Sequence, residues 1–282
     1  MKGQRISVVG WFLVLANLAI VAISASLLWS GWQQAHNVVC NAFDLAVKDA
    51  MYAEPDDVVN DLLALDPSIK SDLLWHRDEN DELWILVAAW METRAVDYDA
   101  FDEKACTNDH FIWVTAVPQL KNKCSNFAQR GKDLDLRLRQ YLGLRPNDRK
   151  DTVIELWVKK RDLLRPCPDP EVEDSECKLG LPDELGKSVS KEYAQWFKKN
   201  IMYYFGDTPY PWTRLGYTYD WGDPANKVGA SEFLIREGSV VIVSSITDTE
   251  QYCSPDYQPE RAPVKPPPSS IPVCGDQTFN RQ

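Results

Sequence analysis

The chain has 282 residues, a net charge of −11 at pH 7 and a sequence pI of about 4.8. Such an acidic balance argues against nucleic acid as a partner, because phosphate binding depends on Lys and Arg. It also argues against docking of the body on anionic lipid. The length is enough for one sizeable hydrophobic core or two small ones.

Residues 6–29 form an apolar run without a charge. A helix needs about 20 such residues to cross a bilayer, so the run predicts a transmembrane signal-anchor. Lys2 and Arg5 precede it and the next basic residue is Lys48. This bias places residues 1–5 in the cytoplasm and the body in the periplasm or extracellular space, on a single-pass inner (cytoplasmic) membrane protein. A cleaved signal peptide is the alternative, and it exports the body equally.

Small residues recur at helical spacing along this run, and an amide lies beside them. A stripe of this kind lets two membrane helices approach closely. It predicts a helix contact with the subunits of a membrane complex. The residues concerned are Ala16, Asn17, Ala19, Ala22 and Ser26.

Beyond the run, the pattern indicates an α+β domain over residues 30–253. Apolar periodicity predicts helices, and short apolar runs rich in β-branched and aromatic residues predict strands. Residues 83–91 also fit a buried helix, and 134–142 fit either a helix or a strand. The expected helices cover 33–52, 55–65, 134–142 and 189–205, with Ser188 as an N-cap, and the expected strands cover 83–91, 111–117 and 153–158.

The C-terminal part of the domain has a β pattern. Three segments, 213–220, 229–235 and 239–246, predict an antiparallel meander, with a tight connection at residues 236–238. A Pro-rich tail follows over residues 254–282.

Charge is divided unevenly along the body. Residues 44–109 are strongly acidic, whereas residues 119–166 are rich in Lys and Arg. The two regions either face each other or present separate surfaces to partners.

Seven cysteines all follow the apolar run, which predicts disulfides in an oxidising compartment. Pairing of neighbours gives Cys106–Cys124, Cys167–Cys177 and Cys253–Cys274, although sequence does not fix the connectivity. Cys40 then stays unpaired, either as a small buried hydrophobe or as a bridge to a second chain. The chain has no C-x-x-C pair, so we predict no metal and no cofactor.

The segment 203–232 is the strongest candidate for a ligand site. Its rings predict a stacking platform for a sugar, and paired carboxyls are what glycoside hydrolysis requires. A packed core is the alternative. The candidate residues are Tyr210, Trp212, Tyr217, Tyr219, Asp220, Trp221, Asp223 and Glu232.

A second candidate is the acidic loop between Cys167 and Cys177, which could attract a basic surface or a divalent cation. No catalytic motif appears elsewhere. The sequence therefore favours a non-catalytic, membrane-anchored accessory or assembly subunit outside the cytoplasm. The alternative is a cell-envelope protein that binds or hydrolyses glycan through the 203–232 segment.

Overall fold

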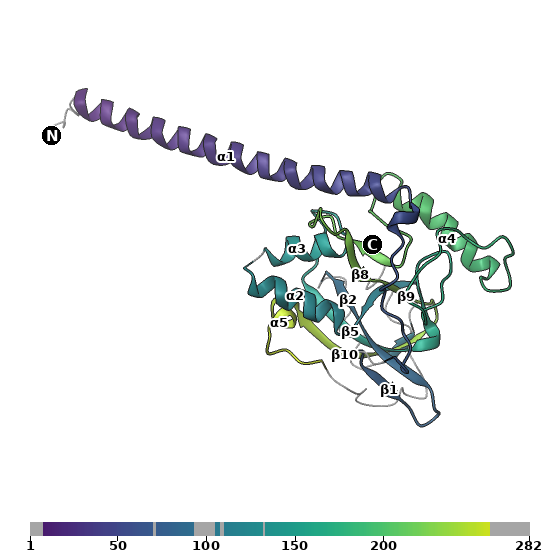
Figure 1. Ribbon diagram of the computed structural model, residues 1–282. Helices are drawn as coiled ribbons and strands as arrows, with labels where there is room; N and C mark the ends of the chain where they lie inside the picture. Colours follow the sequence, from purple (N-terminus) through teal and green to yellow (C-terminus); the bar gives the residue numbers. More distant parts are fainter. Residues whose placement is uncertain (1–7, 70–71, 93–104, 108–109, 132, 260–282) are drawn as a thin grey trace. The chain divides into compact units, whose positions relative to one another are not determined.

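The computed structural model describes residues 8–69, 72–92, 105–107, 110–131 and 133–259 (Figure 1). The chain divides into two compact units, residues 1–44 and residues 45–282. Helix α1 (Val8–Ala50) makes up the described part of the first unit and supplies the first residues of the second. The second unit is a mixed α/β body with an antiparallel sheet and two disulfides.

The sheet of the body has the strand order β3-β10-β5-β2-β4-β9-β6. Strand β1 pairs with the first residues of β2, Leu83 to Ile85, before the part of β2 that pairs with β4. Each of its pairings between described residues is antiparallel. The strands are β1 (Trp75–Arg77), β2 (Leu83–Met91), β3 (Ala105–Thr107), β4 (Ile112–Ala116), β5 (Thr152–Lys159), β6 (Leu163–Leu164), β9 (Phe233–Ile235) and β10 (Val240–Asp248). A separate two-stranded sheet pairs β7 (Tyr217–Tyr219) with β8 (Val228–Ser231).

Strand β2 shows why the body has two cores. Successive side chains of a strand point to opposite faces, and β2 is apolar on both. Ile85 and Val87 belong to an inner cluster that β4, β6 and β9 close from the other side. Trp84 and Leu86 face helices α2 (Gln119–Gln129) and α3 (Leu134–Tyr141) instead. Helix α4 (Lys191–Tyr204) covers the outer face of β9.

Local signals placed several elements correctly. Residues 83–91 are a strand and 134–141 are a helix, which resolves both ambiguities. The Asp133 side chain caps α3 by accepting from the Leu136 amide, and Ser190, not Ser188, caps α4. The expected helix over 55–65 is wrong beyond the turn Pro55–Asp57. After this turn the backbone forms hydrogen bonds to the 165–177 loop instead of helical ones. Leu62 N donates to Ser175 O, and Leu65 N donates to Val172 O.

The predicted C-terminal meander is correct in its first antiparallel pairing, between β7 and β8, and wrong in its second. Strands β8, β9 and β10 follow one another in the chain but do not pair with one another: β8 pairs with β7, β9 with β4 and β6, and β10 with β5 and β3. The reason lies in β9, whose Phe233 and Ile235 enter the inner core while Leu234 faces α4. A strand buried on both faces belongs in the middle of a sheet.

The disulfide pattern corrects two predicted pairs. Cys167 is bonded to Cys177 as expected. Cys124, however, is bonded to Cys253 and neither to Cys106 nor to Cys274. Helices α2 and α5 (Thr249–Cys253) pack on the same face of the sheet and bring the two Cα atoms to 5.2 Å. Cys274 lies beyond the last described residue, as does most of the predicted tail, and Cys40 is free.

Polar contacts fix the last turn of α1 to the β7–β8 hairpin. The Asp49 carboxylate accepts from the Tyr219 hydroxyl at 2.9 Å and from the Lys227 ammonium at 2.8 Å. Lys227 also pairs with Asp57 at 2.6 Å. Arg214, just before β7, donates to the terminal carbonyls of Ala50 and Met51. These orphan carbonyls at the helix end thus gain a cationic partner.

Candidate functional site

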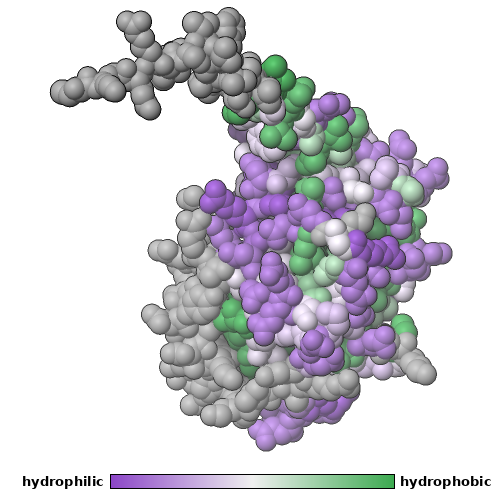
Figure 2. Space-filling view, turned by 90° about the vertical axis from the view of Figure 1, so that its left-hand side faces the viewer, coloured by the Kyte–Doolittle hydropathy of each residue, from purple (hydrophilic) through white to green (hydrophobic). Residues whose placement is uncertain are grey.

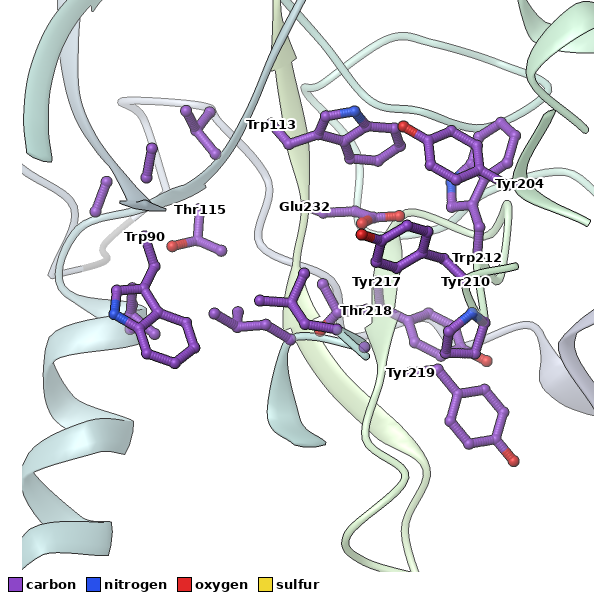
Figure 3. Close-up of a pocket in the computed structure, with 18 residues that line it drawn as sticks. Trp90, Trp113, Thr115, Tyr204, Tyr210, Trp212, Tyr217, Thr218, Tyr219 and Glu232 are labelled. Atoms are coloured by element: carbon purple, nitrogen blue, oxygen red, sulfur yellow. The ribbon is translucent and has the colours of Figure 1, made fainter. Parts of the chain in front are cut away.

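A cavity of about 100 Å³ lies between the sheet, α4 and the β7–β8 hairpin. The carboxyl of Glu232 is its one acidic group, and no Lys or Arg is among the described residues that line it (Figure 3). Half-buried Tyr210 and Tyr219 also line it, whereas most of the other lining residues are buried. The lining is mainly apolar and aromatic, which is typical of a small-molecule site.

Backbone alternation explains why Glu232 enters this cavity. The residue stands between β8 and β9, and its amide donates to Gly216 O at 3.0 Å. Phe233 points into the inner core, so Glu232 shares the opposite face with Leu234. On the neighbouring strand β4, Trp113 pairs with Leu234 and Val114 with Phe233. Continuing this register puts Thr115 opposite Glu232, and both line the cavity.

Three aromatic rings near Glu232 are in mutual contact. The Trp113 ring centroid lies 5.6 Å from that of Tyr204 and 5.8 Å from that of Trp212, both edge to face. The centroids of Tyr204 and Trp212 are 5.3 Å apart. Figure 3 shows the Glu232 carboxyl beside this group of rings. The Tyr204 side chain comes from the C-terminal end of α4, which is held against β9 by the apolar cluster between them.

One oxygen of the buried Glu232 carboxyl, Oε1, lacks a hydrogen-bond partner. It is 6 % exposed, and burial raises its pKa to about 8, an effect that the facing Trp212 indole N–H partly offsets. Neither Glu232 Oε1 nor Trp212 Nε1 has a partner at hydrogen-bond distance, and Thr115 Oγ1 also lacks one. Buried polar atoms without partners are uncommon in folded proteins and point to a ligand, a water or a functional role.

The structure separates the predicted site residues into two groups. Tyr210, Trp212, Tyr217, Tyr219 and Glu232 line the cavity. The other three lie away from it and have structural partners. Asp220 forms an ion pair with Arg137, Trp221 donates to the Leu144 carbonyl, and Asp223 accepts from the Ala225 amide.

The predicted open stacking platform is not formed. Trp212 and Trp221 are 5 % and 6 % exposed, so neither ring offers a face to a sugar chain. Sequence reasoning missed Trp113, Thr115 and Tyr204, which reach the cavity from β4 and α4. The alternation of Trp113 and Thr115 about Val114 was the available signal, because it places both on one face of a strand.

The Arg137–Asp220 pair joins α3 to the start of the β7–β8 loop. Arg137 Nη1 and Nη2 donate to the two carboxylate oxygens at 2.8 and 2.7 Å, and both side chains are largely buried. The guanidinium also lies 4.4 Å from the Phe127 ring centroid. Bidentate geometry of this kind gives a strong, directional contact.

Replacement of Arg137 with leucine is expected to lower the free energy of unfolding by about 3 kcal/mol, since it leaves Asp220 buried and unpaired. Urea denaturation of the variant and of the unchanged chain measures the loss. Exposed Arg149→Leu is the control and should change little. Adding Asp220→Leu to Arg137→Leu should restore part of the loss. A loss no larger than that of the control would contradict the role given to this pair.

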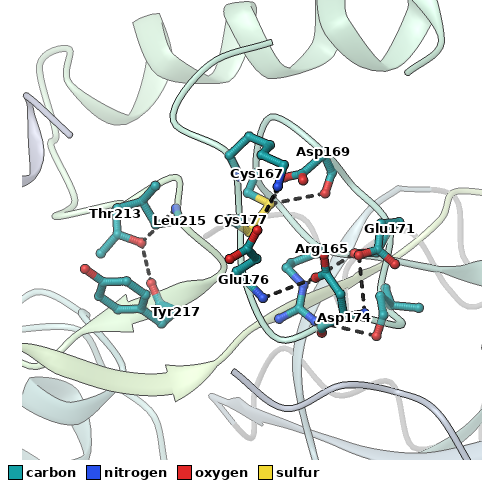
Figure 4. The surroundings of a disulfide bond; sticks show 12 residues. Arg165, Cys167, Asp169, Glu171, Asp174, Glu176, Cys177, Thr213, Leu215 and Tyr217 are labelled. Atoms are coloured by element: carbon teal, nitrogen blue, oxygen red, sulfur yellow. Dashed lines mark hydrogen bonds and ion pairs between the residues drawn. A yellow bond between two sulfur atoms is a disulfide. The ribbon is translucent and has the colours of Figure 1, made fainter. Parts of the chain in front are cut away.

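The acidic loop between Cys167 and Cys177 is held from inside by Arg165 (Figure 4). The buried guanidinium donates to the carbonyls of Asp174 at 2.7 Å and Leu63 at 3.0 Å. The Cys167 and Cys177 sulfurs lie within 4.8 Å of an Asp169 oxygen. They are bonded to each other, however, and a metal needs thiolates. Attraction of a basic partner by this loop stays a prediction.

Apolar side chains are exposed along the described part of α1, including Val21, Leu27 and Leu28, the last 76 % exposed. Figure 2 shows hydrophobic surface on this helix, whereas the body turned to the viewer is mostly hydrophilic. Of the predicted stripe, Ser26 donates to the Ile23 carbonyl within the helix. The side chains of Ala16, Asn17, Ala19 and Ala22 fall outside the described set. Among described residues, no helix has the length and hydropathy of a membrane span.

Comparison with known proteins found no matching protein family, no similar curated protein and no similar solved structure.

Proposed function

We propose that the protein is a non-catalytic, membrane-anchored accessory or assembly subunit whose body lies outside the cytoplasm. One observation carries this proposal: the described part of the apolar run and the first residues of the body belong to a single helix, α1, on which Val21, Leu27 and Leu28 are exposed. Exposed apolar surface of this kind is uncommon on soluble monomers and marks contact with lipid or with other proteins. Lys2 and Arg5 before the run support a cytoplasmic N-terminus.

Other features of the body agree with export. Two disulfides join parts of the described chain, and such bonds persist in oxidising compartments. The free thiol of Cys40 follows the exposed aromatic residues Trp29 and Trp32 along α1. Tryptophan is enriched at membrane interfaces, so this thiol is placed just outside the proposed span.

The position of Cys40 gives a direct test of insertion and orientation. Intact cells or spheroplasts that carry the full chain are treated with a membrane-impermeant maleimide, and membranes are then extracted with alkaline carbonate. We expect Cys40 to be labelled from outside, with the protein retained in the pellet. Labelling that requires permeabilisation would contradict the orientation.

A variant with two arginines introduced into the apolar run tests insertion. Val21→Arg with Ile23→Arg adds about 5 kcal/mol to the cost of insertion on translocon scales, and should release the protein or prevent external labelling. Gln33→Arg, beyond the run, is the control and should leave both readouts unchanged. Purification in mild detergent then tests the subunit role, because stoichiometric membrane partners are expected to come with the chain.

Binding of a small molecule by the body is a second candidate function, favoured by the Glu232 cavity. The alternative predicted from sequence was glycan binding or hydrolysis. Glycoside hydrolysis uses two carboxyl groups, whereas Glu232 is the one carboxyl among the described lining residues. A cavity of about 100 Å³ is also smaller than the engineered cavity of about 150 Å³ that admits benzene. The second candidate is therefore a binding site for a small group, not for a sugar chain.

A further inference from the structure

The cavity combines three properties that together select a ligand charge. Its walls include the rings of Trp113, Tyr204 and Trp212, its one acidic group is Glu232, and the described lining contains no basic side chain. Oxygen Oε1 of Glu232 is buried and has no hydrogen-bond partner. The carboxylate makes the electrostatic potential in such a space favour positive charge, and aromatic rings attract a cation that lies over their faces.

We propose that the Glu232 cavity binds a methylated ammonium group, with the Glu232 carboxylate as its counter-ion and the surrounding rings as its cage. This inference rests on the second candidate function, ligand binding by the body. Quaternary ammonium groups are recognised by aromatic rings through cation–π attraction, which strengthens when the site excludes water.

The polar groups of the cavity favour a methylated over a primary ammonium. A primary ammonium has three N–H donors, and each must find an acceptor when it is buried. The unpartnered acceptors found here are Glu232 Oε1 and Thr115 Oγ1. A methylated ammonium has few or no donors and presents methyl groups to the apolar lining, so its positive charge needs only the carboxylate and the ring faces.

The charged groups around the cavity leave Glu232 as the group that responds to the cation. Tyr204 of α4 and Tyr217 of β7 line the cavity, and burial raises the pKa of both phenols, that of Tyr217 to about 12. They stay neutral near pH 8. Arg145 stacks on Tyr210 at 4.6 Å, but its charge is paired with Asp148.

Binding of the cation is therefore linked to loss of a proton from Glu232. In the empty cavity the pKa of Glu232 is raised to about 8 by burial, and a bound positive charge lowers it. Since the cation binds the ionised carboxylate, its affinity should increase about tenfold from pH 7 to pH 9.

The experiment compares choline, of which only the trimethylammonium head is expected to enter the cavity, with dimethylbutanol, the uncharged alcohol in which carbon replaces the choline nitrogen. Titration calorimetry uses the full chain in detergent at pH 7 and pH 9. We expect choline to bind more tightly than dimethylbutanol by about tenfold or more at pH 9. At pH 7, where Glu232 is mostly protonated in the empty cavity, choline binding should release a proton, which is measured in buffers of different ionisation enthalpy. Glu232→Gln keeps the shape of the side chain and should abolish this preference. Exposed Glu184→Gln is the matched control.

Each outcome bears on the inference. Equal or tighter binding of dimethylbutanol would overturn the cation assignment but leave ligand binding by the cavity standing. Failure of both compounds to bind at millimolar concentration would overturn both. Near-ultraviolet circular dichroism shows whether Glu232→Gln retains the native packing. If Glu232→Gln unfolds, the proton release and the pH dependence of binding by the unchanged chain still test the role of Glu232. An affinity that does not depend on pH would contradict that role.

Discussion

Replacement of both Cys124 and Cys253 with alanine is expected to lower the free energy of unfolding by about 5 kcal/mol. The bond joins residues 129 positions apart in the sequence. In the chain-entropy description, a cross-link stabilises by restricting the unfolded chain, and the effect grows with the logarithm of the loop length. The loop closed here contains every strand from β5 to β10, and the bond also holds α5 and α2 on the same face of the sheet.

The second disulfide provides an internal comparison. Cys167 and Cys177 are 10 positions apart, and their replacement should cost about 3 kcal/mol by the same reasoning. Guanidinium denaturation of the two paired variants measures both values, and Cys40→Ala is the control for loss of a thiol. Equal losses from the two pairs would show that loop length does not decide the contribution of these bonds.

Replacement of Glu232 with glutamine is expected to make the protein more stable at alkaline pH. The folded state holds the pKa of Glu232 near 8, whereas the ordinary value is 4.5. Between these values the folded chain binds a proton that the unfolded chain has lost. The carboxyl therefore contributes its full stability below about pH 4.5 and loses it as the pH rises through 8.

The size of the effect follows from the two pKa values. From pH 4 to pH 9 the unchanged chain should lose on the order of 4 kcal/mol more than Glu232→Gln. Urea denaturation across this pH range, performed on both proteins, gives the difference directly and cancels the contribution of other groups. Glu184→Gln serves again as the exposed control. Parallel pH profiles for the two proteins would mean that Glu232 ionises freely in the folded state.

The elements that sequence could predict are those defined by neighbours along the chain. The apolar face of 189–205 was sufficient to place α4, whereas the short apolar run of 83–91 fitted either a strand or a buried helix until the structure showed β2. The disulfide partner of Cys124 could not be predicted from neighbouring residues along the chain. It depends on α2 and α5 reaching the same face of the sheet, which is decided by packing between elements 129 residues apart.

For the candidate site, too, the sequence predicted which residues are involved but not how they are arranged. Tyr210, Trp212, Tyr217, Tyr219 and Glu232 lie within one segment, and their composition singled them out. Their arrangement did not follow from the sequence, because Glu232 is turned toward α4 by the position of β9 between β4 and β6. The Glu232 carboxyl, a candidate to pair with Asp220 or Asp223, is instead buried among rings from β4 and α4.

The Asp49 carboxylate connects the end of α1 to the β7–β8 hairpin. It lies in the last turn of α1, and it accepts from Tyr219, whose residue lines the cavity. Lys227 and Arg214 join the same hairpin to the same turn. The residues that end α1 and one residue that lines the cavity therefore share a single hydrogen-bonded group, so a substitution of Asp49 removes a contact of both.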